Sequence, residues 1–132
     1  HRHNSEIDQM LRKFTKKKFQ FTFTPHLSPM FRGILSTIYV DLENNISQTK
    51  VLKTLISFYK NESFVKILKP DSLLSTNDVI NTNNCYISVC KSKYSNKIII
   101  LSAIDNLIKG GAGQAVQNLN NKFNFSETTG LK

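Results

Sequence analysis

Apolar side chains recur at helical spacing near both ends and in the middle of the chain. A Ser5–Asp8 pair resembles a capping box and predicts an amphipathic helix over residues 5–17. Its apolar positions are Ile7, Met10, Leu11 and Phe14. Ser47 is predicted to cap a second helix, whose broad apolar face comprises Val51, Leu52, Leu55, Ile56 and Tyr59. A third, amide-rich helix is expected over residues 112–124.

Strand patterns separate these helices. The alternation Phe-Gln-Phe-Thr-Phe predicts a half-buried strand over residues 19–24, and a β-branched run predicts a long strand over 34–42. Shorter strands are predicted at 64–68, 85–91 and 97–103, with a polar loop over 70–84. Helices and strands do not alternate regularly. The sequence therefore predicts an α+β domain with a mixed, mostly antiparallel sheet and helices packed on one face.

A Gly-Gly-Ala-Gly turn, Gly110 to Gly113, lies between the last strand and the last helix. Glycines allow close approach to a ligand or another chain, and the following helix N-terminus offers unpaired N–H groups to anions. The same pattern is typical of a plain loop before a core helix. The turn lacks the βαβ context of a Rossmann fingerprint.

The formal net charge of +9 favours anionic partners such as nucleic acid, phosphorylated metabolites or dinucleotides. The aromatic alternation follows three lysines, Lys16, Lys17 and Lys18. A nucleic-acid-binding surface is therefore an alternative to the simpler interpretation of this segment as a half-buried strand. No apolar run approaches the roughly 18 residues that a membrane span needs, and no signal peptide is visible. A cytoplasmic protein is the default expectation, and an organelle enzyme with an upstream targeting segment stays an alternative. The chain does not begin with Met, and we expect a fragment or a processed piece.

The two cysteines do not form an obvious reactive pair. Cys85 and Cys90 are five residues apart in one predicted strand, so their side chains are expected on opposite faces and a disulfide is not predicted. Neither has a partner at metal-binding spacing, and no metal site is predicted. Both are interpreted as small core or edge residues.

Polar side chains able to bind anions or move protons occur in three places. His1, Arg2 and His3 open the chain; His26 lies in the loop between Pro25 and Pro29, and Arg32 follows that loop. The simpler interpretation is that His1 and His3 belong to a frayed chain terminus and that His26 is a structural residue of its loop. In the last helix, three amides could bind a carboxamide or ribose, or face water: Gln114, Gln117 and Asn118.

Taken together, four separated segments resemble the N-acetyl-γ-glutamyl-phosphate reductase family of the semialdehyde dehydrogenase superfamily. They are His1-Arg2-His3-Asn4-Ser5-Glu6-Ile7, Phe23 to Leu35, Asp105 to Asn118, and Ser126 to Leu131. They occur in the family's order and spacing and span essentially the whole chain. The resemblance implies a C-terminal domain like that of glyceraldehyde-phosphate dehydrogenase. All of residues 1–132 would form this catalytic and dimerisation domain, including the helix that returns to the cofactor domain.

The resemblance also implies a reaction. The family reduces N-acetyl-γ-glutamyl phosphate to N-acetylglutamate 5-semialdehyde with NADPH, in arginine biosynthesis. A cysteine thiolate attacks the acyl phosphate, and hydride transfer to the thioacyl group releases the aldehyde. A homo-oligomer, a dimer or tetramer, is implied as well, with neither a membrane nor a nucleic acid as partner.

Site residues follow from the same resemblance. His1 matches the catalytic acid/base. The expected substrate-binding residues are Arg2, His3, Glu6, His26 and Arg32. The expected cofactor-binding residues, near the nicotinamide of NADP, are Gly110, Gly111, Gly113, Gln114 and Asn118.

This sequence contains neither a Rossmann glycine motif nor a motif for the nucleophilic cysteine, and Cys85 and Cys90 do not replace it. The N-terminal Rossmann domain is therefore expected outside this chain, as a partner. The 132 residues alone are predicted to be inactive. A non-catalytic binding module of the same fold and a basic nucleic-acid-binding domain are the alternative interpretations.

Overall fold

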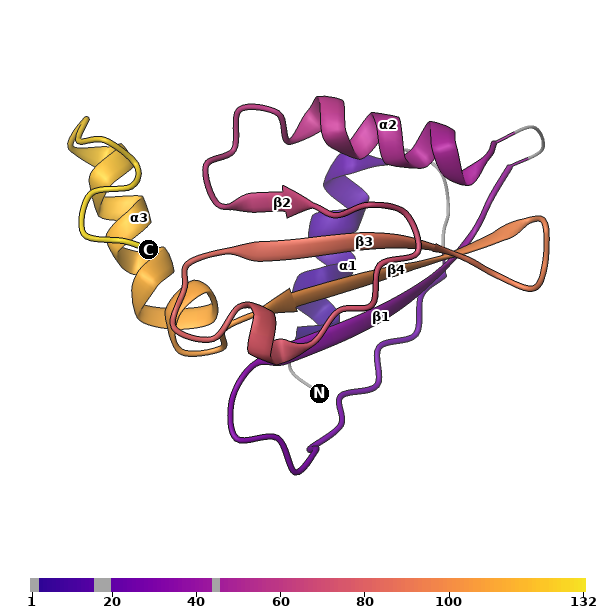
Figure 1. Cartoon of the computed structure of the whole chain (residues 1–132), viewed down its shortest axis with the longest axis horizontal. Helices are drawn as coiled ribbons and strands as arrows, with labels where there is room; N and C mark the ends of the chain where they lie inside the picture. Colours follow the sequence, from indigo (N-terminus) through magenta and orange to yellow (C-terminus); the bar gives the residue numbers. More distant parts are fainter. Residues whose placement is uncertain (1–2, 16–19, 44–45) are drawn as a thin grey trace. The chain divides into compact units, whose positions relative to one another are not determined.

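The computed structural model describes residues 3–15, 20–43 and 46–132. The chain divides into two compact units, His1–Met30 and Phe31–Lys132. Both units are drawn in Figure 1. His1 and Arg2, the first two residues of the N-terminal motif, lie outside the described residues.

Among its described residues, the first unit contains one helix, α1, His3–Phe14. The helix begins before Ser5, so the prediction that Ser5 caps it is wrong. Asp8 instead accepts a hydrogen bond from Arg12 Nε one turn later, at 2.6 Å. The predicted strand at 19–24 is also wrong for residues 20–24, which have no regular structure. The aromatic alternation there has the right period, but a strand also needs a neighbour to satisfy its backbone, and no described strand pairs with it.

A four-stranded mixed sheet forms the centre of the second unit, in the order β1-β4-β3-β2 (Figure 1). The strands are β1 (Ile34–Asp41), β4 (Lys97–Ile104), β3 (Cys85–Lys91) and β2 (Val65–Ile67). β4 pairs antiparallel with both β1 and β3, whereas β2 pairs parallel with β3. The sheet confirms the predicted α+β class and four of the five predicted strands.

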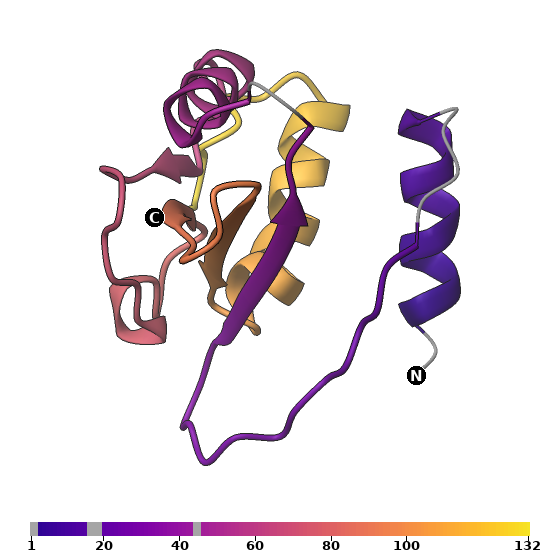
Figure 2. The same cartoon turned by 90° about the vertical axis from the view of Figure 1, so that its right-hand side faces the viewer.

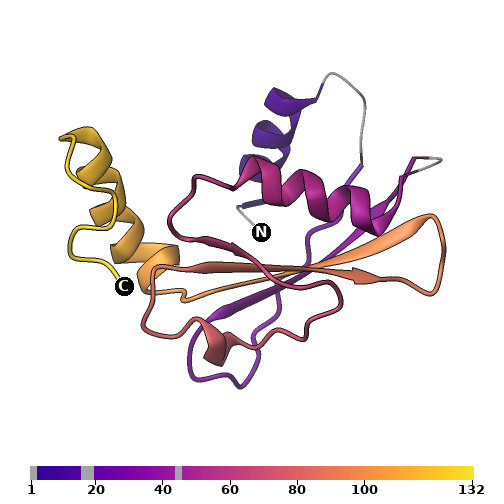
Figure 3. The same cartoon turned by 45° about the horizontal axis from the view of Figure 1, so that its top comes forward.

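Helix α2, Gln48–Phe58, packs against β2 and β3. Ser47 is its N-cap, and the Ser47 hydroxyl accepts a hydrogen bond from the Lys50 N–H at 3.2 Å, as the sequence predicts. Figure 3 shows α2 lying along one side of the strands.

The segment between β2 and β3 supplies part of the core. The short 3₁₀ helix η1, Thr76–Asp78, interrupts it and is closed by a capping box from Ser75 to Asp78. Leu74 and Val79 from this segment pack with Ala103 of β4 in a buried cluster. The predicted polar loop over 70–84 is therefore a structured cover of the sheet, because Leu74 and Val79 are buried on either side of η1 and Thr76 is buried within it.

After β4 the chain forms a π-helical turn, η2 (Ile108–Ala112), and then α3 (Gly113–Lys122). Figure 1 shows α3 beyond the end of the sheet, past the C-terminal end of β4. In Figure 2, α2 is seen end-on and α3 from the side, so the two helices run in different directions. The C-terminal residues fold back on α3, because Asn120 Nδ2 donates to the carbonyl oxygens of Glu127 and Thr129.

Candidate functional site

The N-terminal site candidates that the structure describes lie in the first unit. His3 Nε2 is 4.0 Å from Glu6 Oε2, one helical turn away on α1, and both side chains are exposed. His26 Nδ1 lies 3.1 Å from the carbonyl oxygen of Thr24, also in an exposed segment. These polar groups are accessible to a ligand, and their roles in binding stay predictions.

In the second unit, the buried carboxylate of Asp105 holds Arg32 in place. Arg32 Nε lies 3.0 Å from Oδ1 and 2.9 Å from Oδ2 of Asp105. The backbone N–H groups of Asn81, Leu107 and Ile108 donate to the same carboxylate at 2.8, 2.8 and 3.0 Å. The Asp105 side chain has no exposed surface, whereas Arg32 keeps 20% of its side chain exposed.

These contacts fix the charge of Asp105. Burial acts to raise the pKa of the carboxyl group, because it disfavours the charged form. Hydrogen bonds from the Asn81 N–H, the Arg32 guanidinium and the N–H groups of Ile108 and Leu107 outweigh burial and lower the pKa of Asp105 to about 2. Asp105 is therefore ionised at any physiological pH, and it balances the Arg32 charge.

We call the contacts of the Asp105 carboxylate with Arg32, Asn81 and the start of η2 the Asp105 junction. The sequence around Asp105 explains how it forms. Asp105 lies two residues before Leu107 and its side chain caps the start of η2, as aspartate commonly does in Asx turns. The next residue, Asn106, accepts a hydrogen bond through Oδ1 from the Gly33 N–H at 2.7 Å. Gly33 has φ +106°, and a Cβ there would lie 2.6 Å from Thr76 Cβ, so a glycine is required.

The glycine turn has an exposed part and a buried part. Gly110 and Gly111 are exposed, and the Gly110 N–H donates to the Asp105 carbonyl oxygen at 2.9 Å. Gly113 is buried, and a Cβ there would lie 2.5 Å from both Asn83 Oδ1 and Ile108 Cγ2. The missing side chain of Gly113 thus serves close packing inside the fold.

The amides of α3 also divide into two groups. Gln114 Nε2 donates to Asn118 Oδ1 at 3.0 Å on the exposed side of the helix. Gln117 points inward: its Oε1 accepts from Asn83 Nδ2 at 2.8 Å and from Lys109 Nζ at 2.7 Å. Gln117, which the sequence left open as a ligand-binding or water-facing residue, is a structural residue in this fold. Asn83 Oδ1 is the one buried side-chain polar atom without a partner in the described ranges.

A lysine and a glutamate complete what we call the Gln117 cluster, formed by Asn83, Lys109, Gln117 and Glu127. Burial lowers the pKa of Lys109, opposed by the charges of Cys85, Glu127 and Glu62. Lys109 Nζ also lies 5.5 Å from the ring centroid of Phe64.

The Glu127 carboxylate accepts a hydrogen bond from Gln117 Nε2 at 2.7 Å. A hydrogen bond from the Ser63 side chain lowers the pKa of Glu127; burial opposes this, and Gln117 and the charge of Lys109 add to it. The charges and amides of the Gln117 cluster therefore bind one another across four separate segments of the chain.

Of the predicted site residues, the structure joins Arg32 to the glycine segment through Asp105. His3, Glu6 and His26 lie in the other unit. Sequence reasoning missed Asp105 as a central residue, although an aspartate directly after a strand and before a glycine turn is a recognisable capping signal. It also missed Lys109 and Glu127, because only folding brings them to Gln117.

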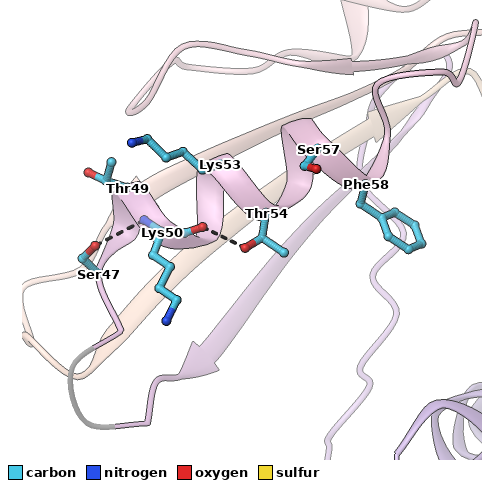
Figure 4. A pocket seen from close by; sticks show the side chains of 7 residues that line it. All are labelled: Ser47, Thr49, Lys50, Lys53, Thr54, Ser57 and Phe58. Atoms are coloured by element: carbon cyan, nitrogen blue, oxygen red, sulfur yellow. Dashed lines mark hydrogen bonds between the residues drawn. The ribbon is translucent and has the colours of Figure 1, made fainter.

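A second feature of the surface is an open hollow along α2. Figure 4 shows its lining side chains, which all come from Ser47 and the helix itself: Ser47, Thr49, Lys50, Lys53, Thr54, Ser57 and Phe58. The hollow holds two lysines and no carboxylate or histidine, so it is not a candidate active site. Within the described ranges, no three histidine, cysteine, aspartate or glutamate side chains are grouped as a metal ion would need. No described helix is both long and apolar enough to cross a membrane.

Comparison with known proteins gives consistent matches. The family model for the semialdehyde dehydrogenase dimerisation domain matches residues 1–106. A protein of Thermoanaerobacter pseudethanolicus is 47% identical over 131 residues, 99% of this chain. Relatives from Halothermothrix orenii and Campylobacter jejuni subsp. doylei are 45% and 43% identical over 100% of it. All three are named N-acetyl-gamma-glutamyl-phosphate reductase, and the chain spans 38 to 39% of their length.

Proposed function

The chain belongs to the semialdehyde dehydrogenase dimerisation-domain family, and we propose that it is the C-terminal part of a reductase for N-acetyl-γ-glutamyl phosphate. The observation that carries the proposal is the 47% identity to a reductase of that name over 131 residues. The product would be N-acetylglutamate 5-semialdehyde, for arginine biosynthesis in the cytoplasm.

In this proposal the chain's own residues bind substrate and move protons. His1 acts as acid/base, since an imidazole titrates near neutrality and can both take and give a proton. Arg2, His3, Glu6, His26 and Arg32 bind and orient the substrate. Of these, Arg32 has the strongest structural support, because Asp105 binds its guanidinium while 20% of the side chain stays exposed.

The glycine segment and α3 fit one side of a nicotinamide cofactor. Gly110 and Gly111 present exposed backbone without side chains, and Gln114 and Asn118 present an exposed pair of amides. Such groups suit a carboxamide, which both donates and accepts hydrogen bonds. Gly113 would support this surface from inside. NADPH, when bound, supplies the hydride.

The same proposal explains why the 132 residues would be inactive alone. Cys85 Sγ lies 3.5 Å from the Ser102 hydroxyl, and Cys90 Sγ lies 3.9 Å from the Ser72 carbonyl oxygen. Both thiols are held in the sheet, and in the described parts of the chain no histidine is hydrogen-bonded to either. A nucleophilic cysteine and the dinucleotide-binding domain would come from the N-terminal part of the enzyme.

We also propose that a second copy of the chain is a partner. The family is described as a dimerisation domain, and four apolar side chains of β1 are exposed: Ile34, Leu35, Ile38 and Tyr39. Ile34 and Ile38 lie on one face of this edge strand and Leu35 and Tyr39 on the other, because side chains alternate along a strand. Exposed apolar side chains of this kind are typical of a contact between subunits. Sedimentation of the chain should show a dimer or tetramer, and Ile38→Asp should shift it toward monomer.

A chimaera tests the catalytic proposal. The C-terminal region of the Thermoanaerobacter pseudethanolicus reductase, which matches this chain, is replaced by the 132 residues, and NADPH oxidation with N-acetyl-γ-glutamyl phosphate is measured. We expect activity in the chimaera and none in the 132-residue chain alone. His1→Asn in the chimaera should lower kcat by about 10²- to 10⁴-fold, as expected for loss of a general acid/base. A folded, assembled chimaera without activity would contradict the proposal and favour a non-catalytic module.

A further inference from the structure

The Arg32 guanidinium is hydrogen-bonded to the rest of the fold through its Nε atom only, among the described residues. Its Nε lies within 3.0 Å of both carboxylate oxygens of Asp105. Neither Nη group has a hydrogen-bond partner among the described residues, and the side chain is 20% exposed. A guanidinium carries five N–H donors in a planar fork, so the two Nη groups keep four donors available.

Asp105 fixes the orientation of that fork. Its carboxylate is ionised, has no exposed surface and accepts three backbone N–H groups besides Arg32. These donors come from two separate segments, at Asn81 and at the start of η2. A carboxylate held from two sides cannot rotate freely, so the plane of the Arg32 guanidinium is restricted as well.

The same junction joins Arg32 to the glycine turn. Asp105 caps η2 through the N–H groups of Leu107 and Ile108, and its carbonyl oxygen accepts from the Gly110 N–H. Asn106 holds the Gly33 N–H beside Arg32. One short segment, residues 105–110, therefore sets the positions of both the arginine and the glycines.

We propose that Asp105 is a positioning residue that aims the two Nη groups of Arg32 at an oxyanion of the substrate. The inference rests on the proposed function for the identity of that oxyanion, which is either the phosphate or the carboxylate of N-acetyl-γ-glutamyl phosphate. Both present two oxygens at the spacing that a guanidinium fork binds in bidentate fashion. Because Nε is already bonded to Asp105 and the side chain is partly exposed, an anion that reaches the Nη groups does not have to break the ion pair.

Nuclear magnetic resonance of arginine side chains tests the proposal in the 132-residue chain. The sequence contains three arginines, Arg2, Arg12 and Arg32, so the Nε–H spectrum is simple to assign with Arg12→Lys and Arg32→Lys. Inorganic phosphate and N-acetyl-L-glutamate are titrated separately, with sodium chloride at equal ionic strength as the control. We expect a saturable shift of the Arg32 resonance, and the probe that saturates at the lower concentration identifies the group bound.

Arg12 serves as the internal reference. It is exposed and paired with Asp8, so it experiences the general ionic environment without a built site. An Arg32 resonance that does not move, or that moves only as Arg12 does, would overturn the anion site.

Two variants test the role of Asp105. Asp105→Asn replaces the carboxylate that accepts from the Asn81 N–H and from Arg32 Nε by a neutral amide. We expect the affinity of Arg32 for the anion to fall about tenfold, which is the effect of losing one charge-assisted hydrogen bond. Asn106→Ala removes only the acceptor of the Gly33 N–H and should weaken binding to a smaller extent. It keeps the test decisive if Asp105→Asn does not fold. Unchanged affinity in every folded variant would overturn the positioning role.

This result is separable from the chimaera experiment. An active chimaera with no anion binding at Arg32 would leave the reductase proposal intact and refute the role of Asp105. Anion binding at Arg32 in a chain whose chimaera is inactive would support the site and refute the reductase.

Discussion

Two networks of buried and half-buried polar side chains involve residues near the glycine turn, and they differ in how completely the fold satisfies them. In the Gln117 cluster, Lys109, Gln117 and Glu127 bind one another, and Gln117 uses both ends of its amide inside the protein. At Asp105 the carboxylate is fully bonded, whereas Arg32 is bonded to it through Nε and keeps 20% of its side chain exposed. Polar side chains that look alike in the sequence therefore differ in the fold: the first group holds α3 to the C-terminal residues, and the second leaves Arg32 partly exposed, where we propose that it binds a ligand.

The largest effect should come from breaking the Asp105 junction. Asp105→Ala leaves Arg32 and three N–H groups without their acceptor, and we expect the free energy of unfolding to fall by about 4 kcal/mol. Urea unfolding at pH 7 measures it. Asp41→Ala is the matched control, because Asp41 pairs with Lys97 at an exposed position, and it should cost about 0.5 kcal/mol or less. Equal losses in the two variants would show that the junction carries no special stability.

Filling the space at Gly113 should be the next most costly change. Gly113→Ala places a Cβ 2.5 Å from Asn83 Oδ1 and 2.9 Å from the Ile108 carbonyl oxygen, and we expect a loss of about 2 to 3 kcal/mol. Gly110→Ala is the control, since its Cβ would meet nothing nearer than 3.4 Å. Thermal unfolding of both variants gives the comparison, and a tolerant Gly113 would mean that the Gln117 cluster adapts to the added methyl group.

Acid should remove the contribution of the Asp105 charge to the free energy of unfolding. Its pKa of about 2 lies below the ordinary value of 3.8, so its stabilising contribution is complete above that ordinary value and is lost as the pH falls toward 2. The stability difference between the wild-type chain and Asp105→Asn should therefore shrink by about 2 kcal/mol between pH 6 and pH 2. Urea unfolding at the two pH values measures this, and a difference that stays constant or grows would contradict the lowered pKa.

The smallest effect is expected at Lys109. Burial lowers its pKa, so the charged form is unfavourable in the fold, and Gln117 Oε1 still accepts from Asn83 without it. Lys109→Met should change the free energy of unfolding by less than about 1 kcal/mol. Glu127→Gln removes the opposite charge and tests the same cluster from its other side. A loss at Lys109 as large as that at Asp105 would mean that the two groups do not differ as described.

Local patterns were sufficient for most elements of the second unit. The β-branched run gives β1, Ser47 gives the start of α2, and the apolar runs give β3 and β4, because side-chain periodicity reports directly on which face is buried. The same reasoning failed at residues 20–24, where the alternation has no described strand to pair with. It also passed over Leu74 and Val79, since the two apolar pairs Leu73-Leu74 and Val79-Ile80 in a polar stretch carry no period.

The candidate site shows the same division. The sequence alone determined the family, through four motifs in order along the chain, and it singled out Arg32 and the glycine turn from that resemblance. Only the tertiary structure decided that Asp105 joins them, that Gly113 packs inside and that Gln117 is occupied by Asn83, Lys109 and Glu127. The physical reason is distance along the chain: Arg32 and Asp105 are 73 residues apart, and Asn83 and Gln117 are 34 apart. Periodicity and capping extend over a few residues, so contacts of this range exist only once the sheet has brought the segments together.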